Sequence, residues 1–105
     1  EAIRKARERC TEVTGTPTGH PVRCIGNKLT KKFLELEYNH ASNEEMAALG
    51  VGKLRAAVVD GDVENGSVMS GQSAALVNDI RSCADIVTSM VEECNAIMKG
   101  LGANV

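Results

Sequence analysis

With 105 residues and a formal net charge of −2, the chain is one domain or part of one, and its charge gives no general attraction to nucleic acid or a membrane surface. Hydrophobic residues make up 43% of it, but one Phe, one Tyr and no Trp predict an aliphatic core. No apolar run approaches the roughly 20 residues of a transmembrane helix. Four cysteines without CxxC spacing and two scattered histidines predict reduced, buried thiols and no zinc site.

The first 25 residues predict short elements joined by a loop. Residues 1–9 are interpreted as the end of a helix, and the β-branched segment 11–14 is predicted to be extended. The loop 15–21, GTPTGHP, holds two prolines and two glycines in seven residues. A second extended segment is predicted at 22–25. His20 in the loop is either a site residue or a supporting one.

Helix signals dominate the next part of the chain. Asn27 is predicted to cap a helix over about 28–38, with one apolar stripe and a separate lysine face. The lysine face contains Lys28, Lys31 and Lys32. Ser42 and Glu45 form a capping box that starts a short helix ending at Gly50. The run LRAAVV within 53–60 is too short for periodicity to decide, and we interpret it as helix.

The stretch 61–76, GDVENGSVMSGQSAAL, predicts a turn that feeds a helix. Gly61-Asp62 and Asn65-Gly66 are turn dipeptides, and Ser67 is a capping residue. The helix would consist of small side chains, with Gln72 as its long polar one. Such a helix serves either tight packing or the close approach of a flat ligand. Asp60, Asp62 and Glu64 crowd the turn, where they either hold a cation or, as we favour, cap backbone groups in solvent.

Apolar residues recur at intervals of three and four from Ile80 to Leu101 and predict an amphipathic helix of about 18 residues, closed by Gly100 and Gly102. On this helix Cys83 and Cys94 would lie about 16 Å apart and could not form a disulfide. The fold class is therefore predicted to be mainly α, at about 60% helix. Motifs of the GxSxG, Walker or GxGxxG kind are absent from the sequence.

The run GDVENGSVMSGQSAALV, with LRAAVV before it and TGHPVR further upstream, resembles the C-terminal part of the FMN-dependent enoyl-acyl-carrier-protein reductase II proteins. These proteins belong to the nitronate monooxygenase (2-nitropropane dioxygenase) superfamily. The resemblance extends from Glu1 to about Leu101. The family usually has alanine at the position of Ser70 and glycine at that of Ala75. Both differences exchange one small residue for another.

The resemblance implies a parent built on a (β/α)8 TIM barrel, which needs about 250 residues, so the barrel itself is absent from this chain. We expect residues 1–105 to be the C-terminal helical segment of that larger flavoprotein. Residues 1–60 would form a small helical subdomain with loops. Residues 61–105 would provide the flavin-side helix and the C-terminal amphipathic helix.

The resemblance also implies a function for the parent. It would reduce a trans-2-enoyl thioester on acyl carrier protein in fatty acid biosynthesis, with hydride passing from NAD(P)H through FMN. We expect Ser67, Met69, Gly71 and Gln72 to contact FMN, no catalytic residue or metal ligand in this chain, and a supporting role for His20. The expected location is cytoplasmic, without nucleic acid or membrane partners.

The resemblance also implies partners, and two alternative functions stay open. The lysine face is either simply solvated, as we favour, or meets acyl carrier protein, which is acidic. The remainder of the barrel would pack on this chain, and the parent is a candidate homodimer. One alternative function is FMN-dependent oxidation of alkyl nitronates. The other is a non-catalytic helical interaction module.

Overall fold

The computed structural model describes residues 1–102, so the last three residues of the segment 61–105 lie outside it. Its elements follow the order β1 (Thr11–Thr14), η1 (Thr16–Thr18), β2 (Val22–Ile25), α1 (Lys28–Tyr38), α2 (Asn43–Gly50), α3 (Lys53–Val58), η2 (Gln72–Leu76) and α4 (Cys83–Gly100). About half of the chain is helical, counting α and 3-10 turns together. The mainly helical class is confirmed, and among the described residues the only sheet is two-stranded.

The two predicted extended segments pair with each other as an antiparallel hairpin. Thr11 lies opposite Ile25, and Thr14 lies opposite Val22. The GTPTGHP loop closes the hairpin around the 3-10 turn η1, where Gly15 adopts a positive φ of 84°. Residues 1–9, by contrast, form turns instead of the predicted helix end. Only one i to i+4 backbone bond, from Lys5 N–H to the Glu1 carbonyl, forms there, and a single turn is too short to propagate.

Capping residues set the helix starts as the sequence predicts. The Asn27 side chain accepts a hydrogen bond from the Thr30 N–H at the start of α1, and Ser42 does the same for Glu45 at the start of α2. The helical interpretation of LRAAVV is confirmed by α3. Helix α2 ends at Gly50 as predicted, and the left-handed conformation is adopted by Gly52, with φ of 72°.

The stretch 67–71 is extended, so the predicted helix capped by Ser67 is wrong. Its backbone runs beside β2: the Ile25 N–H donates to the Val68 carbonyl, the Ser70 N–H donates to the Arg23 carbonyl, and Met69 is bridged to Cys24. Serine and glycine are poor helix formers, and pairing with β2 satisfies these backbone groups instead. Only the 3-10 turn η2, beginning at Gln72, follows.

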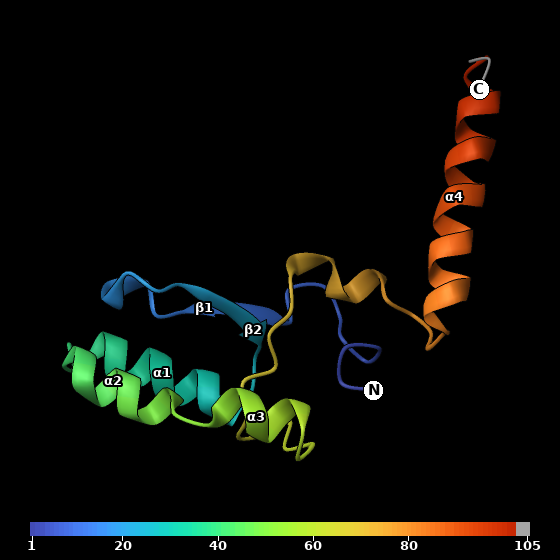
Figure 1. The fold of residues 1–105 in the computed structure, drawn as a ribbon. Helices are drawn as coiled ribbons and strands as arrows, with labels where there is room; N and C mark the ends of the chain where they lie inside the picture. Colours follow the sequence, from blue (N-terminus) through green and yellow to red (C-terminus); the bar gives the residue numbers. More distant parts are fainter. Residues whose placement is uncertain (103–105) are drawn as a thin grey trace.

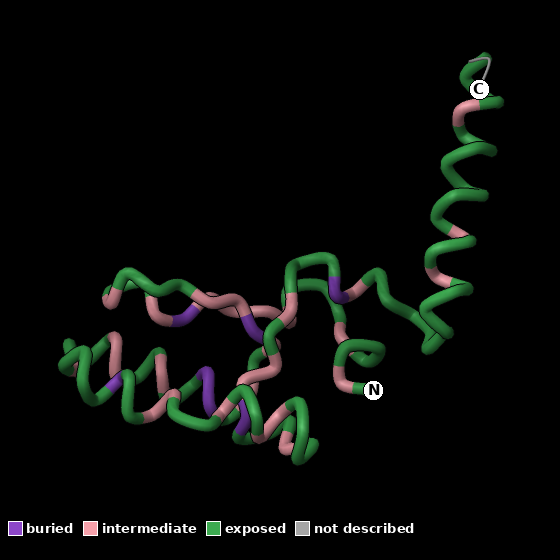
Figure 2. The backbone as a smooth tube through the Cα atoms, viewed as in Figure 1, coloured by how far each residue is buried: buried purple, intermediate pink, exposed green. Residues whose placement is uncertain are grey.

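The C-terminal helix α4 has the predicted length of 18 residues and stands away from the rest of the chain (Figure 1). The molecule accordingly extends over 57 × 27 × 20 Å, with a radius of gyration of 18.1 Å, where a compact chain of this size has about 13 Å. Apart from Gly66 and from Ala74 in η2, the buried residues lie in the hairpin and in helices α1 and α2 (Figure 2). None of the described residues of α4 is buried.

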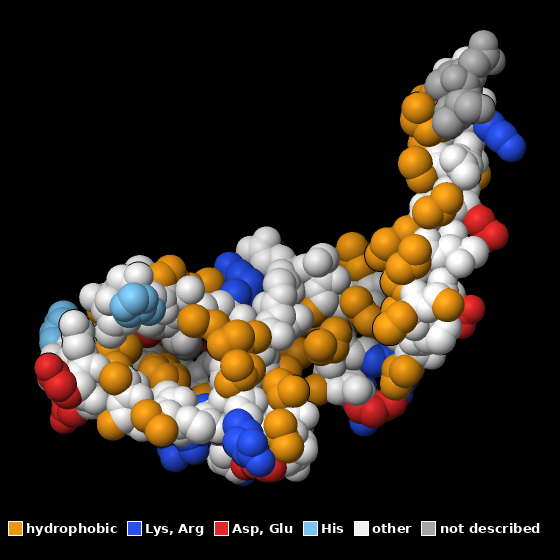
Figure 3. All heavy atoms as spheres, viewed as in Figure 1, with side chains coloured by type: hydrophobic (Ala, Val, Ile, Leu, Met, Phe, Trp, Pro, Cys, Tyr) orange, Lys and Arg blue, Asp and Glu red, His pale blue; other side chains and the backbone are white. Residues whose placement is uncertain are grey.

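Apolar side chains are correspondingly exposed along α4 (Figure 3). Val87, Met90 and Ile97 each expose more than half of their surface. The prediction of buried cysteines holds only for Cys24, because Cys83 and Cys94 lie exposed on this helix. Among the described residues, no helix combines the length and the apolar character that crossing a bilayer requires.

Candidate functional site

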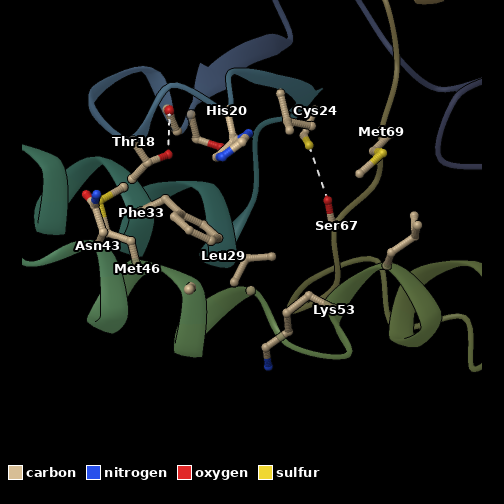
Figure 4. A pocket seen from close by; sticks show the side chains of 16 residues that line it. Thr18, His20, Cys24, Leu29, Phe33, Asn43, Met46, Lys53, Ser67 and Met69 are labelled. Atoms are coloured by element: carbon tan, nitrogen blue, oxygen red, sulfur yellow. Dashed lines mark hydrogen bonds between the residues drawn. The ribbon is translucent and has the colours of Figure 1, made fainter.

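A cavity of about 470 Å³ lies between the hairpin, helices α1 to α3 and the extended segment that contains Ser67 and Met69 (Figure 4). This volume falls in the range of small-molecule sites, roughly 300–1,000 Å³. The residues that line it are Thr14, Gly15, Thr18, His20, Val22, Cys24, Leu29, Phe33, Asn43, Met46, Ala47, Gly50, Lys53, Leu54, Ser67 and Met69. The cavity therefore draws on segments that are up to 55 positions apart in the sequence, from Thr14 to Met69.

The wall of this cavity is mainly apolar. Leu29 and Met46 are almost fully buried, each at 4% exposure, and the Phe33 ring lies beside them (Figure 4). An added Cβ on Gly50 would lie 3.5 Å from Cζ of Phe33, so α2 passes close to that ring. The lining contains no carboxylate, and Lys53 is its one side chain of fixed charge. An uncharged, elongated apolar group suits such a wall.

At one side of the cavity, Cys24 of β2 contacts Ser67 of the extended segment 67–71. The Sγ and Oγ atoms of these residues share a hydrogen bond of 3.3 Å (Figure 4). The Ser67 N–H donates to the Lys53 carbonyl at 2.8 Å, which ties the same residue to α3. Ser67 therefore fixes the position of the segment leading to Met69, a role different from the predicted helix cap.

Asn27 connects helix α1 to the turn that precedes this wall. Besides capping α1, its side-chain amide donates to the carbonyls of Val63 at 2.9 Å and Gly66 at 2.8 Å. Gly66 sits tightly at this junction, because an added Cβ would lie 2.5 Å from the Asp62 carbonyl oxygen and 2.6 Å from the Ala57 nitrogen. The turn is thereby held against both α1 and α3.

Of the three acidic side chains in the turn 60–66, Asp62 caps a backbone group as we favoured. The Asp62 carboxylate accepts from the backbone and side-chain N–H groups of Asn65, which lowers the pKa of Asp62. Glu64 pairs with Lys28 at 2.6 Å, and this hydrogen bond raises the pKa of Lys28. Within residues 1–102, no cluster of His, Cys, Asp or Glu could hold a metal ion.

The hairpin loop closes another side of the cavity. The Glu37 carboxylate at the end of α1 accepts a hydrogen bond from the Gly15 N–H, which anchors the loop to that helix. Gly15 has no room for a side chain, since an added Cβ would clash with the His20 carbonyl. His20 itself lines the cavity, with its ring above Phe33 (Figure 4). Its supporting role stays a prediction, although its place in the lining brings it nearer to a site than the sequence suggested.

The four residues predicted to contact a flavin divide into two pairs. Ser67 and Met69 line the cavity, and Met69 is 48% exposed. Gly71 and Gln72 lie outside the lining and are exposed. An added Cβ on Gly71 would have no atom within 4 Å, so the space in front of that backbone is open. The predicted contacts with a flavin remain a prediction.

Sequence reasoning missed most of the cavity. Leu29 and Phe33 belong to the apolar stripe predicted for the helix 28–38, and such a stripe indicates core rather than a binding wall. Met46 carried no signal beyond its place in a short helix. The β-hairpin and the pairing of 67–70 with β2 bring these residues together, and both are long-range features that local patterns do not encode.

Comparisons with known proteins show that the chain is similar to one family. Residues 1–93 match the sequence model of the family described as nitronate monooxygenase. The solved structure of FabK from Thermotoga maritima superposes with a TM-score of 0.85 at 37% identity, covering 94% of this chain and 31% of that one. A methionine-to-alanine mutant of FabK from the same organism gives 0.75 at 34% identity, covering 94% and 28%. No curated protein sequence matches.

Proposed function

The chain belongs to the nitronate monooxygenase family, and from this we propose that it is part of an FMN-dependent enoyl-acyl-carrier-protein reductase. It spans about a third of the length of the solved FabK structures, so the activity belongs to a larger parent. The observation that carries the proposal is the cavity: the segment with the reductase-like GSVM sequence forms one wall of an apolar, carboxylate-free space. A flavin next to that wall would meet an apolar substrate inside it.

The residues present fit one wall of a flavin site. Met69 offers a half-exposed, polarisable thioether, and the open space at Gly71 lets a flat ring approach the backbone. The exposed Gln72 amide can donate to and accept from the ring edge. When bound, FMN supplies hydride transfer between NAD(P)H and the enoyl double bond. This chain orients the ring and keeps water from the acyl group, while the rest of the parent binds the phosphate.

Acyl carrier protein is the proposed macromolecular partner, and the lysine face of α1 supports it. Lys28 is already engaged with Glu64, so Lys31 and Lys32 carry this proposal. Both are exposed, and no ion pair among the described residues involves either. Two exposed cations suit an acidic carrier and would speed its association with the enzyme.

The test uses the full-length protein that contains this sequence. We expect it to purify with bound FMN and to oxidise NADH or NADPH when a trans-2-enoyl thioester of acyl carrier protein is added. The 105-residue chain alone should do neither, because the proposed phosphate-binding part is missing from it.

Two results would overturn the reductase. Oxygen consumption with an alkyl nitronate, without oxidation of NAD(P)H by enoyl thioesters, would assign the nitronate monooxygenase activity, which the family match supports as the second candidate. A colourless full-length protein without turnover would leave a non-catalytic helical interaction module as the remaining candidate function. Parental turnover by the short chain would contradict the division of labour proposed above.

A further inference from the structure

We propose that the cavity between the β1–β2 hairpin and helices α1 and α2 receives the aliphatic tail of the acyl thioester, and that Phe33 limits the chain length it accepts. This inference rests on the proposed function, because it takes the reacting end of the substrate to lie at Met69. It goes further by assigning the tail to residues of this chain.

Continuity of the cavity is the first argument. Ser67 and Met69 lie at one side of it and Phe33, Met46 and Asn43 at the other, with Leu29 between them (Figure 4). For a substrate whose double bond reacts beside Met69, the cavity offers a direction lined by this chain into which the tail can extend. That direction leads past Leu29 to Phe33.

The chemistry of the lining is the second argument. Cys24, Leu29 and Met46 are buried and offer apolar atoms and a thiol that already bonds to Ser67. A strongly polar ligand would lose its hydration beside these buried side chains, whereas each methylene of an alkyl chain gains from leaving water. The polar lining residues Thr18 and Asn43 lie at the side away from Met69, and His20 lies above Phe33 (Figure 4).

Phe33 occupies the position that decides how far a tail extends. Its ring projects from α1 into the cavity, and α2 passes beside it at Gly50 (Figure 4). A larger ring at this position would fill the passage beyond Leu29 and leave the space at Met69 unchanged. Long and short substrates should therefore respond differently to the same substitution.

The experiment measures kcat/KM of the full-length enzyme for butenoyl and dodecenoyl thioesters in the wild type, Phe33→Trp and Leu34→Trp. Leu34 is the matched control, since it is the next residue of α1 and does not line the cavity. We expect Phe33→Trp to lower kcat/KM for dodecenoyl by about tenfold or more and to leave butenoyl within about twofold, the scale on which hydrophobic pockets discriminate by size. Leu34→Trp should leave kcat/KM unchanged for both thioesters.

Direct binding separates this inference from the proposed reaction. Calorimetry with saturated dodecanoyl and butanoyl thioesters of N-acetylcysteamine should show tighter binding of the longer ligand, and Phe33→Trp should remove that advantage. If enoyl thioesters are reduced but Phe33→Trp affects both lengths equally, the tail lies elsewhere and the inference is wrong. If no reduction occurs yet the length-dependent binding persists, the proposed reaction fails and the apolar site stands.

Should Phe33→Trp not fold, Phe33→Leu must shift the preference toward longer chains, and an unchanged preference would overturn the inference.

Discussion

Asn27 shows how much one side chain can contribute beyond its local signal. From the sequence it is a helix cap, and the structure confirms that its oxygen accepts the Thr30 N–H at 3.0 Å. The same amide donates to two carbonyls of the turn that leads to Ser67, at positions 63 and 66. A residue in a helix cap thus also positions the wall of the cavity.

Substitution can separate these two roles. Asn27→Ser keeps a capping oxygen but loses both donors, so we expect it to lower the free energy of unfolding by about 1–3 kcal/mol, as two lost hydrogen bonds would. Asn27→Ala also loses the cap and should cost about 1 kcal/mol more. Urea unfolding of the full-length protein and both variants provides the measurement. Equal stability of Asn27→Ser and the wild type would show that the two donated bonds contribute nothing.

The sequence predicts the helices of this fold best. It predicts the pairing of the strands worst. Helices α1, α2 and α4 each begin with a side-chain cap that lies within three residues of its partner, so their starts are local events. The pairing of Met69 with Cys24 joins residues 45 positions apart, and no local pattern reports it. The residues after Ser67 are therefore predicted to be helical from the sequence, although the backbone of Val68 and Ser70 bonds to β2.

Helix α4 should be the least protected element of the 105-residue chain. It has 18 residues, a length at which an isolated helix in water is marginal, and most of its large apolar side chains are exposed. We expect its amides to exchange with solvent much faster than those of α1 and the hairpin, because local stability follows buried contacts.

Hydrogen–deuterium exchange on the short chain and on the full-length protein tests this expectation. Dilution of the short chain should leave the α4 rates unchanged, which serves as the control for self-association. In the full-length protein, where the remainder is proposed to pack on this chain, the same amides should be protected. Protection of α4 equal to that of α1 in the dilute short chain would contradict this account.

The molecule as a whole has the shape expected of one part of a larger protein. Its radius of gyration of 18.1 Å reflects a small packed region and a projecting helix, and among residues 1–102 four hydrophobic side chains form the buried core. The sequence predicted this incompleteness through its resemblance to a family with a longer chain. It could not predict the cavity, because three helices and a hairpin must first be brought together to form it.

The central claim is that the segment from Ser67 to Gln72 faces a flavin in the parent enzyme, and the FMN content of Gly71→Leu tests it most directly. The open space at Gly71 would be filled by the leucine side chain, so we expect FMN per protein to fall sharply while helical content and the thermal midpoint of the apoprotein stay unchanged. Gln72→Ala, which removes a hydrogen-bonding group without adding bulk, is the companion variant and should weaken FMN binding less. Normal FMN content and normal activity in both variants would contradict the claim and leave this segment with a purely structural role.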